Sequence, residues 1–239
     1  MQKYKNLIFD LDDTLMDTWG QLVANALEEA CSKMINLGLN ASIQDAIQYR
    51  RQLYKEKSRS NFCEKLVQHF GVQAQSDSEK VISAGNKAFY QRQIFENIEV
   101  FPGVHDLLKN LQLSYNLYLV TSGNAETQNQ KIKLLDIESY FKCIFCVDPF
   151  AGQSKKTAFE KILRTTNTQG SENLSIGNRI DMEICQAKEL GMDTCLILHG
   201  EYIHLEPSCP EERPDFKLEK ATEIIRLLES PVEKIPSNY

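Results

Sequence analysis

Five short apolar runs, each bounded by polar or turn residues, are spaced along the chain. Runs that are apolar throughout are typical of strands buried on both faces, whereas a half-exposed strand alternates apolar and polar residues. Beyond Pro102 these runs alternate with helical patterns, as in a parallel sheet with helices on both faces. The pattern predicts an α/β core with a Rossmann-like parallel sheet, whose strands are expected at 6–10, 116–122, 143–148, 173–177 and 194–199.

The segment after the first run has a different pattern. From Trp19 onward, apolar residues recur at alternating steps of three and one, which marks one face of an amphipathic helix that ends at Gly38. Ser42 and Ser60 are expected N-caps of two further helices. A fourth helical pattern runs from about residue 78 to residue 95.

These patterns predict two domains. Four helices without an intervening strand are expected to pack as a four-helix bundle over residues 17–95. Residues 1–16 and 96–239 are expected to form the α/β core. The bundle is therefore an insert that follows the first strand of the core.

The composition is that of a globular protein, with 42% hydrophobic and 25% charged residues. The net charge of -6 provides no broad basic surface for a nucleic-acid backbone. No apolar stretch approaches the roughly 20 residues of a membrane helix, and the first residues lack the apolar run of a signal peptide. We therefore expect a cytoplasmic protein without nucleic-acid or membrane partners.

The seven cysteines are an odd number, and most stand in apolar contexts. This favours buried free thiols over disulfides. Cys143 and Cys146 form a lone CxxC inside an expected strand, with no second pair at the spacing of a structural zinc site. A zinc or redox role is therefore not expected for them.

Polar residues at the ends of the expected strands are the candidates for chemistry. In an open parallel sheet, ligands bind beyond the carboxyl ends of the strands. Asp10 closes an apolar run, and a carboxylate so close to the core needs a functional reason. Three pairs stand at these strand ends: Asp10 with Asp12, Thr121 with Ser122, and Asn178 with Asp181.

Four motifs carry a resemblance to a known family. DLDDT at residues 10–14 matches DxDxT, the first motif of the haloacid dehalogenase superfamily, whose members are mostly phosphatases. LYLVTSGN with Thr121 resembles the second motif, Lys155 or Lys156 would supply the third, and IGNRIDMEI resembles the fourth. With its helical insert, the chain resembles the phosphatase branch that has a type 1 helical cap, such as the phosphoglycolate phosphatases. The resemblance covers nearly the whole chain and implies the haloacid dehalogenase-like fold.

The resemblance implies a role for each residue of the first two motifs. Asp10 is the expected nucleophile, because a carboxylate can attack a phosphoryl group and form an aspartyl-phosphate. Asp12 is the expected general acid and base. The dehalogenases of the superfamily lack this aspartate, so Asp12 favours phosphate chemistry. Thr121 and Ser122 are expected to bind phosphoryl oxygens; the alternative is that they only turn the chain and cap the next helix.

A lysine is expected to balance the negative charge of the nucleophile and the phosphate. The Lys-Pro pair that is common in the family is absent from GQSKKTAFEKIL. Lys155 and Lys156 therefore remain alternatives, and helical phase relative to Phe159 favours Lys155 as the phosphate-binding residue.

The resemblance also implies a Mg²⁺ cofactor. In the family the nucleophile, the backbone carbonyl of the second aspartate and an acid of the fourth motif hold this ion. Here the usual position of that acid is Asn178, whose amide oxygen can coordinate a cation but brings no charge. Asp181 and Glu183 are candidates to compensate. The expected metal ligands are Asp10, Asp12, Asn178 and Asp181.

The combined prediction is a Mg²⁺-dependent phosphatase that acts on a small phosphorylated metabolite. An alternative is a phosphate-binding or regulatory protein of the same fold with weak turnover, which Asn178 and the missing Lys-Pro pair favour. Haloacid dehalogenation is a third possibility, which Asp12 opposes. The residues leave the substrate and the oligomeric state open.

Overall fold

The computed structural model describes residues 3–55, 61–229 and 234–235. Its contacts divide the chain into two compact units. One unit combines Met1–Thr18 with Asn97–Tyr239, and the other is Trp19–Glu96. We call them the core unit and the helical unit and describe each by itself.

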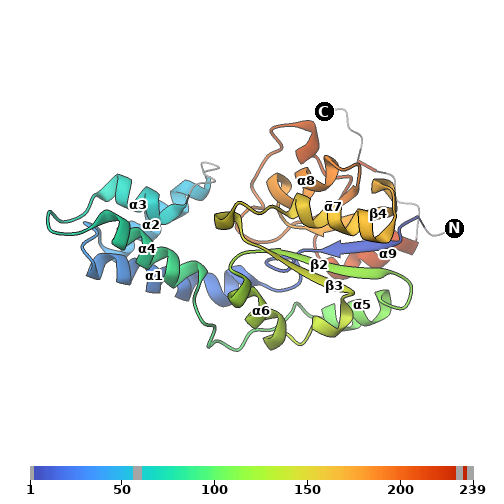
Figure 1. The fold of residues 1–239 in the computed structure, drawn as a ribbon, viewed down its shortest axis with the longest axis horizontal. Coiled ribbons are helices and arrows are strands. Elements are labelled where there is room, and N and C mark those ends of the chain that lie inside the picture. Colours follow the sequence, from blue (N-terminus) through green and yellow to red (C-terminus); the bar gives the residue numbers. More distant parts are fainter. Residues whose placement is uncertain (1–2, 56–60, 230–233, 236–239) are drawn as a thin grey trace. The chain divides into compact units, whose positions relative to one another are not determined.

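The core unit contains one six-stranded parallel sheet with the order β3-β2-β1-β4-β5-β6 (Figure 1). The chain builds outward from β1 to β2 and β3, then returns to the other side of β1 for the remaining strands. This confirms the predicted α/β class. The strands are β1 Asn6–Phe9, β2 Asn116–Ser122, β3 Cys143–Val147, β4 Asn173–Gly177, β5 Asp193–Ile197 and β6 Phe216–Leu218.

Five of these strands coincide with the apolar runs, and burial explains this for all but the edge strand β3, which is fully buried only at Val147. All residues of β1, β4 and β5 are buried, as expected for strands with helices on both sides. The sixth strand, β6, was not predicted. It has three residues within a proline-rich stretch, too few to leave a periodic pattern in the sequence.

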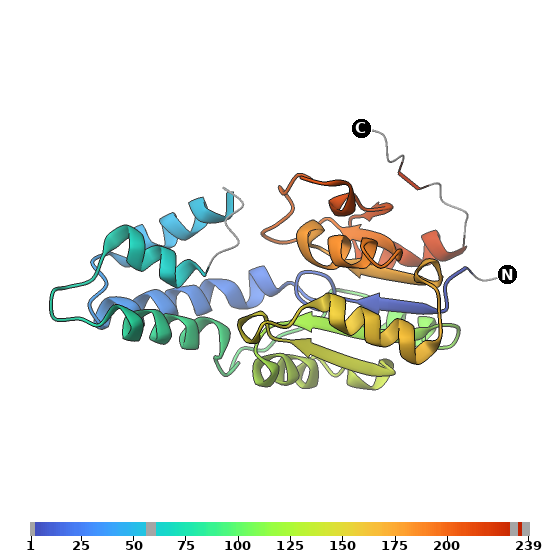
Figure 2. The same ribbon diagram turned by 45° about the horizontal axis from the view of Figure 1, so that its top comes forward.

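Helices cover both faces of this sheet. In the two views of Figures 1 and 2, α7 and α8 lie on one face and α5 and α6 on the other. On the first face, Phe159 and Ile162 of α7 pack with Ile8 of β1 and Val120 of β2 in one buried cluster. The helices of the core unit are α5 Val104–Leu111, α6 Ala125–Leu134, α7 Lys155–Thr166, α8 Cys185–Lys188 and α9 Ile224–Glu229.

The helical unit contains the π-helical turn η1 Trp19–Val23 and four α-helices: α1 Ala24–Asn36, α2 Ile43–Lys55, α3 Phe62–Phe70 and α4 Ser78–Tyr90. Their apolar faces form one cluster that includes Leu27, Met34 and Leu66. The Ser42 hydroxyl accepts a hydrogen bond from the backbone N–H of Asp45 and so caps α2, as predicted.

Two helix ends differ from the expected positions or lie beyond the described residues. Ser60, the expected cap of the third helix, lies outside the described residues. Asn61 caps α3, because its side chain accepts a hydrogen bond from the backbone N–H of Cys63 at 2.9 Å. The fourth helix ends at Tyr90 and not near residue 95.

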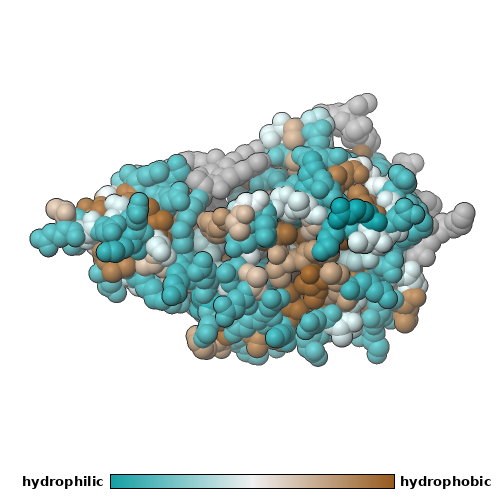
Figure 3. All heavy atoms as spheres, viewed as in Figure 1, coloured by the Kyte–Doolittle hydropathy of each residue, from teal (hydrophilic) through white to brown (hydrophobic). Residues whose placement is uncertain are grey.

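The surface of the face drawn in Figure 3 is mostly hydrophilic, with an apolar area on the core unit. Among the described helices, none has both the length and the apolar character to span a membrane.

Candidate active site

The carboxyl ends of three neighbouring strands bring the candidate residues together. Phe9 of β1 pairs with Leu119 of β2 on one side and with Ile176 of β4 on the other. The residues that follow Phe9 therefore lie at the same edge of the sheet as the carboxyl ends of β2 and β4. Asp10 continues this arrangement, because its backbone N–H donates to the carbonyl of Ile176 at 2.9 Å.

A buried lysine lies between two buried carboxylates at these ends. The Nζ of Lys155 donates to Oδ1 of Asp10 at 2.5 Å and to Oε2 of Glu183 at 3.0 Å. The side chains of Lys155 and Glu183 are both 2% exposed, and that of Asp10 is 7% exposed. Lys155 is the first residue of α7, so the start of this helix delivers a positive charge to the nucleophile position predicted from the sequence.

The contacts of the two candidate lysines differ, and they show which of the two lies at the site. The side chain of Lys156 is 39% exposed, and its Nζ pairs with Glu189 at 2.7 Å. This is an ordinary surface ion pair. Lys155 is the lysine that reaches Asp10.

Burial and neighbouring charges change the acidity of Asp10. Burial raises the pKa of Asp10 to about 7, since a carboxylate away from water loses hydration. The Lys155 ammonium opposes this rise, whereas the carboxylates of Glu183 and Asp12 add to it. Asp10 and Glu183 in turn raise the pKa of Lys155, although burial acts to lower it. Lys155 is therefore held as a cation.

Glu183 is a candidate acid of the fourth motif but not one of the four expected metal ligands. It belongs to the π-helical turn η5 Ile180–Ile184, and its Oε1 accepts the backbone N–H of Arg179 at 2.8 Å. One oxygen thus caps the turn while the other binds Lys155. Gly177 makes this possible, because a Cβ there would lie 2.2 Å from Cγ of Glu183.

Asp12 is held by three donors. Lys131 donates to Oδ1 at 2.6 Å, Gln128 to Oδ2 at 2.8 Å and the Thr18 hydroxyl to Oδ1 at 2.5 Å. Burial acts to raise the pKa of Asp12, but Lys131 and the hydrogen bonds from Thr18 and Gln128 outweigh it and lower the pKa. The Asp12 carboxylate is therefore ionised in this arrangement.

Lys131 and Gln128 are not among the residues that the sequence motifs predict for the site. Both lie on α6, three residues apart, so they project from the same face of the helix. Gln128 Nε2 also donates to the Thr121 hydroxyl and to the carbonyl of Ser122. One feature of the sequence points to these two residues. α6 directly follows the second motif, and its polar residues Gln128 and Lys131 have the spacing of one helix face.

The end of β2 offers donors to an anion. Thr121 is fully buried, and the buried Oγ of Ser122 has no hydrogen-bond partner among the described residues. The Asn124 side chain caps α6 by accepting the backbone N–H of Thr127 at 3.2 Å. A helix that starts directly after such a strand favours an anion at its N-terminus. Asn124 thus caps α6, and the Ser122 hydroxyl next to this cap has no partner within the part of the chain that the structure describes. Both alternatives expected for this segment, the helix cap and a donor for an anion, are compatible with these contacts.

The arrangement at Asn178 fits a small divalent cation. Asn178 is buried, and its Nδ2 donates to the backbone carbonyl of His199 at 3.2 Å, so its Oδ1 is the atom left to coordinate. The carboxylates of Glu183 and Asp12 raise the pKa of Asp10, and a cation would relieve this crowding of negative charge. The carboxylate of Asp10, the backbone carbonyl of Asp12 and the amide of Asn178 would together offer only oxygen ligands, which suits Mg²⁺.

Asp181 has a different partner. Arg179 binds both of its carboxylate oxygens, through Nε at 3.0 Å and Nη2 at 2.7 Å. The same guanidinium lies 3.9 Å from the centre of the Tyr202 ring. The structure thus joins Asp181 to Arg179 and joins Glu183 to Asp10 through Lys155. A metal-binding role for Asp181 stays a prediction.

Comparisons with known proteins agree with this geometry. Residues 7–197 match the model of the haloacid dehalogenase-like hydrolase family. The glyceraldehyde 3-phosphate phosphatase of Pyrococcus abyssi is 33% identical over 82% of this chain and 82% of its own length. The enzyme of the same name from Pyrococcus furiosus is 28% identical over 96% of this chain and 95% of its own.

Solved structures show the same fold at lower identity. The protein YfnB from Bacillus subtilis, solved bound to magnesium, has a TM-score of 0.66 and 22% identity, covering 96% of this chain and all of its own. CbbY from Rhodobacter sphaeroides, solved in complex with phosphate, has a TM-score of 0.65 and 16% identity, covering 94% of this chain and 96% of its own.

Proposed function

Since this chain belongs to the haloacid dehalogenase-like hydrolase family, we propose that it hydrolyses small phosphomonoesters through an aspartyl-phosphate on Asp10. The contact between Asp10 and Lys155 carries the proposal. A buried carboxylate that faces a buried ammonium at the ends of parallel strands is a nucleophile beside a fixed positive charge. A structural ion pair alone would not need Glu183 as a second carboxylate on the same lysine.

In the first step, an Asp10 oxygen attacks phosphorus, and the bond from phosphorus to the ester oxygen breaks. Thr121, Ser122 and the N-terminus of α6 donate hydrogen bonds to the phosphoryl oxygens, while Lys155 balances their charge. The unpaired Oγ of Ser122 supports this role. The products of the step are the aspartyl-phosphate and the alcohol.

Asp12 transfers the protons in both steps. It protonates the leaving alkoxide and then accepts a proton from the water that attacks the aspartyl-phosphate, which restores Asp10. Lys131 and Gln128 position its carboxylate. Because Lys131 holds Asp12 ionised, Asp12 must take up a proton before it can act as the acid.

The proposed Mg²⁺ ligands are Asp10, the backbone carbonyl of Asp12 and the amide oxygen of Asn178. Glu183 adds negative charge nearby and Asp181 is the remaining candidate acid. When bound, the cation neutralises charge on the transferring phosphoryl group. The chain's own residues fix the position of the nucleophile and the proton donor.

The names of the relatives support a substrate class for this chain. Several proteins that this chain resembles over most of its length are named glyceraldehyde 3-phosphate phosphatases. This supports a small phosphorylated sugar or polyol as the substrate. We further propose that the helical unit acts as the cap that selects it.

The direct test is hydrolysis of p-nitrophenyl phosphate and of glyceraldehyde 3-phosphate, with and without Mg²⁺. The Asp10→Asn variant should lose several orders of magnitude in kcat. The matched control is Asp106→Asn, which changes an exposed acid on α5 and should retain activity. Full activity in Asp10→Asn, or equal activity after complete removal of Mg²⁺, would contradict the proposal.

A phosphate-binding protein with weak turnover is the second candidate. Asn178 favours it, because an amide in place of a carboxylate weakens the hold on a divalent cation. Binding of a phosphate analogue such as vanadate without hydrolysis over a broad panel of phosphomonoesters would support this candidate. Hydrolysis of any member of the panel at an ordinary enzymatic rate would exclude it.

A further inference from the structure

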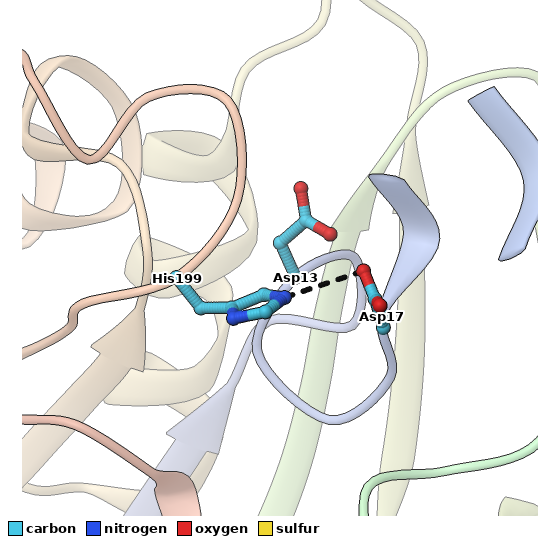
Figure 4. A group of neighbouring side chains, drawn as sticks. All are labelled: Asp13, Asp17 and His199. Atoms are coloured by element: carbon cyan, nitrogen blue, oxygen red, sulfur yellow. Dashed lines mark hydrogen bonds and ion pairs between the residues drawn. The ribbon is translucent and has the colours of Figure 1, made fainter. Parts of the chain in front are cut away.

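Three potential metal ligands converge beside the proposed catalytic group. Asp13 and Asp17 lie in the segment after β1, and His199 lies in the loop after β5 (Figure 4). One ligand atom from each residue lies within 4.8 Å of the other two. Segments more than 180 residues apart in sequence thus bring together an imidazole and two carboxylates.

We propose that Asp13, Asp17 and His199 bind a first-row transition-metal dication such as Zn²⁺ or Mn²⁺, at a site distinct from the proposed Mg²⁺ site. Nitrogen and oxygen ligands lie about 2.0–2.2 Å from Zn²⁺, so two of them can be at most about 4.4 Å apart. Nε2 of His199 and Oδ1 of Asp17 are already 3.2 Å apart. Asp13 needs at most a small side-chain rotation to complete the set.

The fold holds these donors in place. Asp13 is 8% exposed and has a φ of 56°, a left-handed conformation that is uncommon for a residue with a side chain. Its carboxylate lies against Gly200, where a Cβ would approach Oδ2 of Asp13 to 2.3 Å. The edge-to-face contact of His199 with Phe101, at 4.8 Å and 83°, fixes the imidazole ring. Little reorganisation is therefore needed to bind an ion.

The donor set indicates the class of ion. Imidazole is a common ligand of Zn²⁺, Mn²⁺ and Co²⁺, whereas Mg²⁺ prefers oxygen alone. Three protein ligands leave further coordination positions to water. An ion at this site would fix Asp17 to the loop after β5. The next residue, Thr18, donates to Asp12, so this ion would also restrain a donor of the proposed acid-base residue.

The proposal is tested by metal binding to the full chain, with Co²⁺ as the spectroscopic probe and calorimetry with Zn²⁺ for affinity. The His199→Gln and Asp17→Asn variants should lose one bound equivalent or bind it over 10–100-fold more weakly, the range that even outer-shell changes cause. His204→Gln, the same substitution in the same loop, is the matched control and should bind as the wild type does. Circular dichroism would verify that each variant is folded.

The Asp10→Asn variant separates this site from the catalytic one. It should lose Mg²⁺ affinity but retain the Co²⁺ absorption bands that depend on His199. Unchanged Co²⁺ spectra and Zn²⁺ affinity in His199→Gln and Asp17→Asn would overturn the proposal, as would a wild type that binds neither ion. If phosphatase activity is absent but these variants lose Co²⁺, only the proposed function fails.

Discussion

The Nζ atom of Lys155 lies 2.5 Å from Oδ1 of Asp10, and both side chains are almost fully buried. Glu183 pairs with the same Nζ atom, so the Lys155 ammonium lies between two buried carboxylates. A buried pair that loses one partner leaves an uncompensated charge, which is far more costly than the loss of an exposed pair. The site is therefore sensitive to changes that remove a single charge.

Replacing Lys155 with methionine should impair both catalysis and stability. We expect kcat to fall by about 10²–10³, the usual effect of removing one group that stabilises charge in the transition state. The free energy of unfolding should fall by about 3–5 kcal/mol, since Asp10 and Glu183 would remain buried without a cation. Steady-state kinetics and urea unfolding measure these effects. Lys156→Met, which removes an exposed lysine, is the control; an equal loss there would contradict the assignment.

Replacing Lys131 with methionine should shift the pH dependence of the reaction. Lys131 lowers the pKa of Asp12, so the pKa should rise when the ammonium is removed. The acid limb of the kcat profile should therefore move to higher pH if ionised Asp12 is the base for the attacking water. Lys133→Met changes an exposed lysine of the same helix and should leave the profile in place. An unchanged profile in Lys131→Met would mean that Lys131 does not tune Asp12.

Introducing a carboxylate at Asn178 should tighten Mg²⁺ binding. One added charge near a divalent ion gains several kcal/mol before solvent is considered, from about 4 kcal/mol per pair of unit charges at 4 Å with a dielectric constant near 20. The lost hydrogen bond to the His199 carbonyl offsets part of this gain. We expect a Kd for Mg²⁺ at least about tenfold lower in Asn178→Asp, measured by calorimetry, and no change in Asn129→Asp on the exposed face of α6. Equal Mg²⁺ affinity in wild type and Asn178→Asp would remove Asn178 from the metal site.

Adding one methyl group at Gly177 should displace Glu183. The new Cβ would lie 2.2 Å from Cγ of Glu183, so the acid must move away from Lys155. We expect the free energy of unfolding to fall by about 1–3 kcal/mol, as for other overpacked sites, and kcat to fall with it. Urea unfolding and kinetics of Gly177→Ala check this. Wild-type values in both would show that Glu183 is not required at its present position.

A cluster far from the proposed nucleophile should govern acid stability. Burial acts to raise the pKa values of Asp193 and Asp215, but hydrogen bonds from lysines outweigh it and lower both: Lys234 with Lys3 on Asp193, and Lys188 with Lys234 on Asp215. In the unfolded chain the pKa of an aspartate is about 3.9. Since the folded values are lower, this stability is present above that pH and lost as the pH falls through the folded values.

The urea midpoint of the wild type should therefore decrease as the pH falls below about 4. Asp193→Asn should be less stable at pH 7 but lose less stability between neutral and acidic pH. Asp106→Asn, an exposed acid on α5, should retain the wild-type acid dependence. An identical slope in Asp193→Asn and wild type would show that the cluster does not control acid unfolding.

Local patterns were sufficient for most of the fold. The apolar runs at β1, β2, β4 and β5 reflect strands packed on both sides, and this environment leaves a continuous signal in the sequence. β3 has the same signal although it lies at the edge of the sheet and is fully buried only at Val147. The polar residues Asp10, Thr121 and Asn178 were predicted because each stands at or next to the carboxyl end of an apolar run, where a parallel sheet binds its ligands. Three-residue β6 carries no such signal, because its identity as a strand depends on pairing with β5.

The choice among neighbouring residues depended on the tertiary structure. Lys155 and Lys156 are adjacent in sequence, and helical phase relative to Phe159 only favours the first. The packing of α7 against the sheet turns Lys155 inward to Asp10 and leaves Lys156 paired with Glu189 at the surface. Asp181 and Glu183 are likewise two residues apart, and η5 is a π-helical turn, so a period of 3.6 residues does not predict which acid faces Lys155.

By itself, the sequence determined the α/β core, the helical insert and the strand ends at which the chemistry gathers, because burial and turn formation act on neighbouring residues. The tertiary structure alone decided that Glu183 shares Lys155 with Asp10, that Lys131 and Gln128 hold Asp12, and that His199 meets Asp13 and Asp17. Each of these contacts joins segments whose relative position is fixed by sheet register and helix packing, which no local pattern in the chain records.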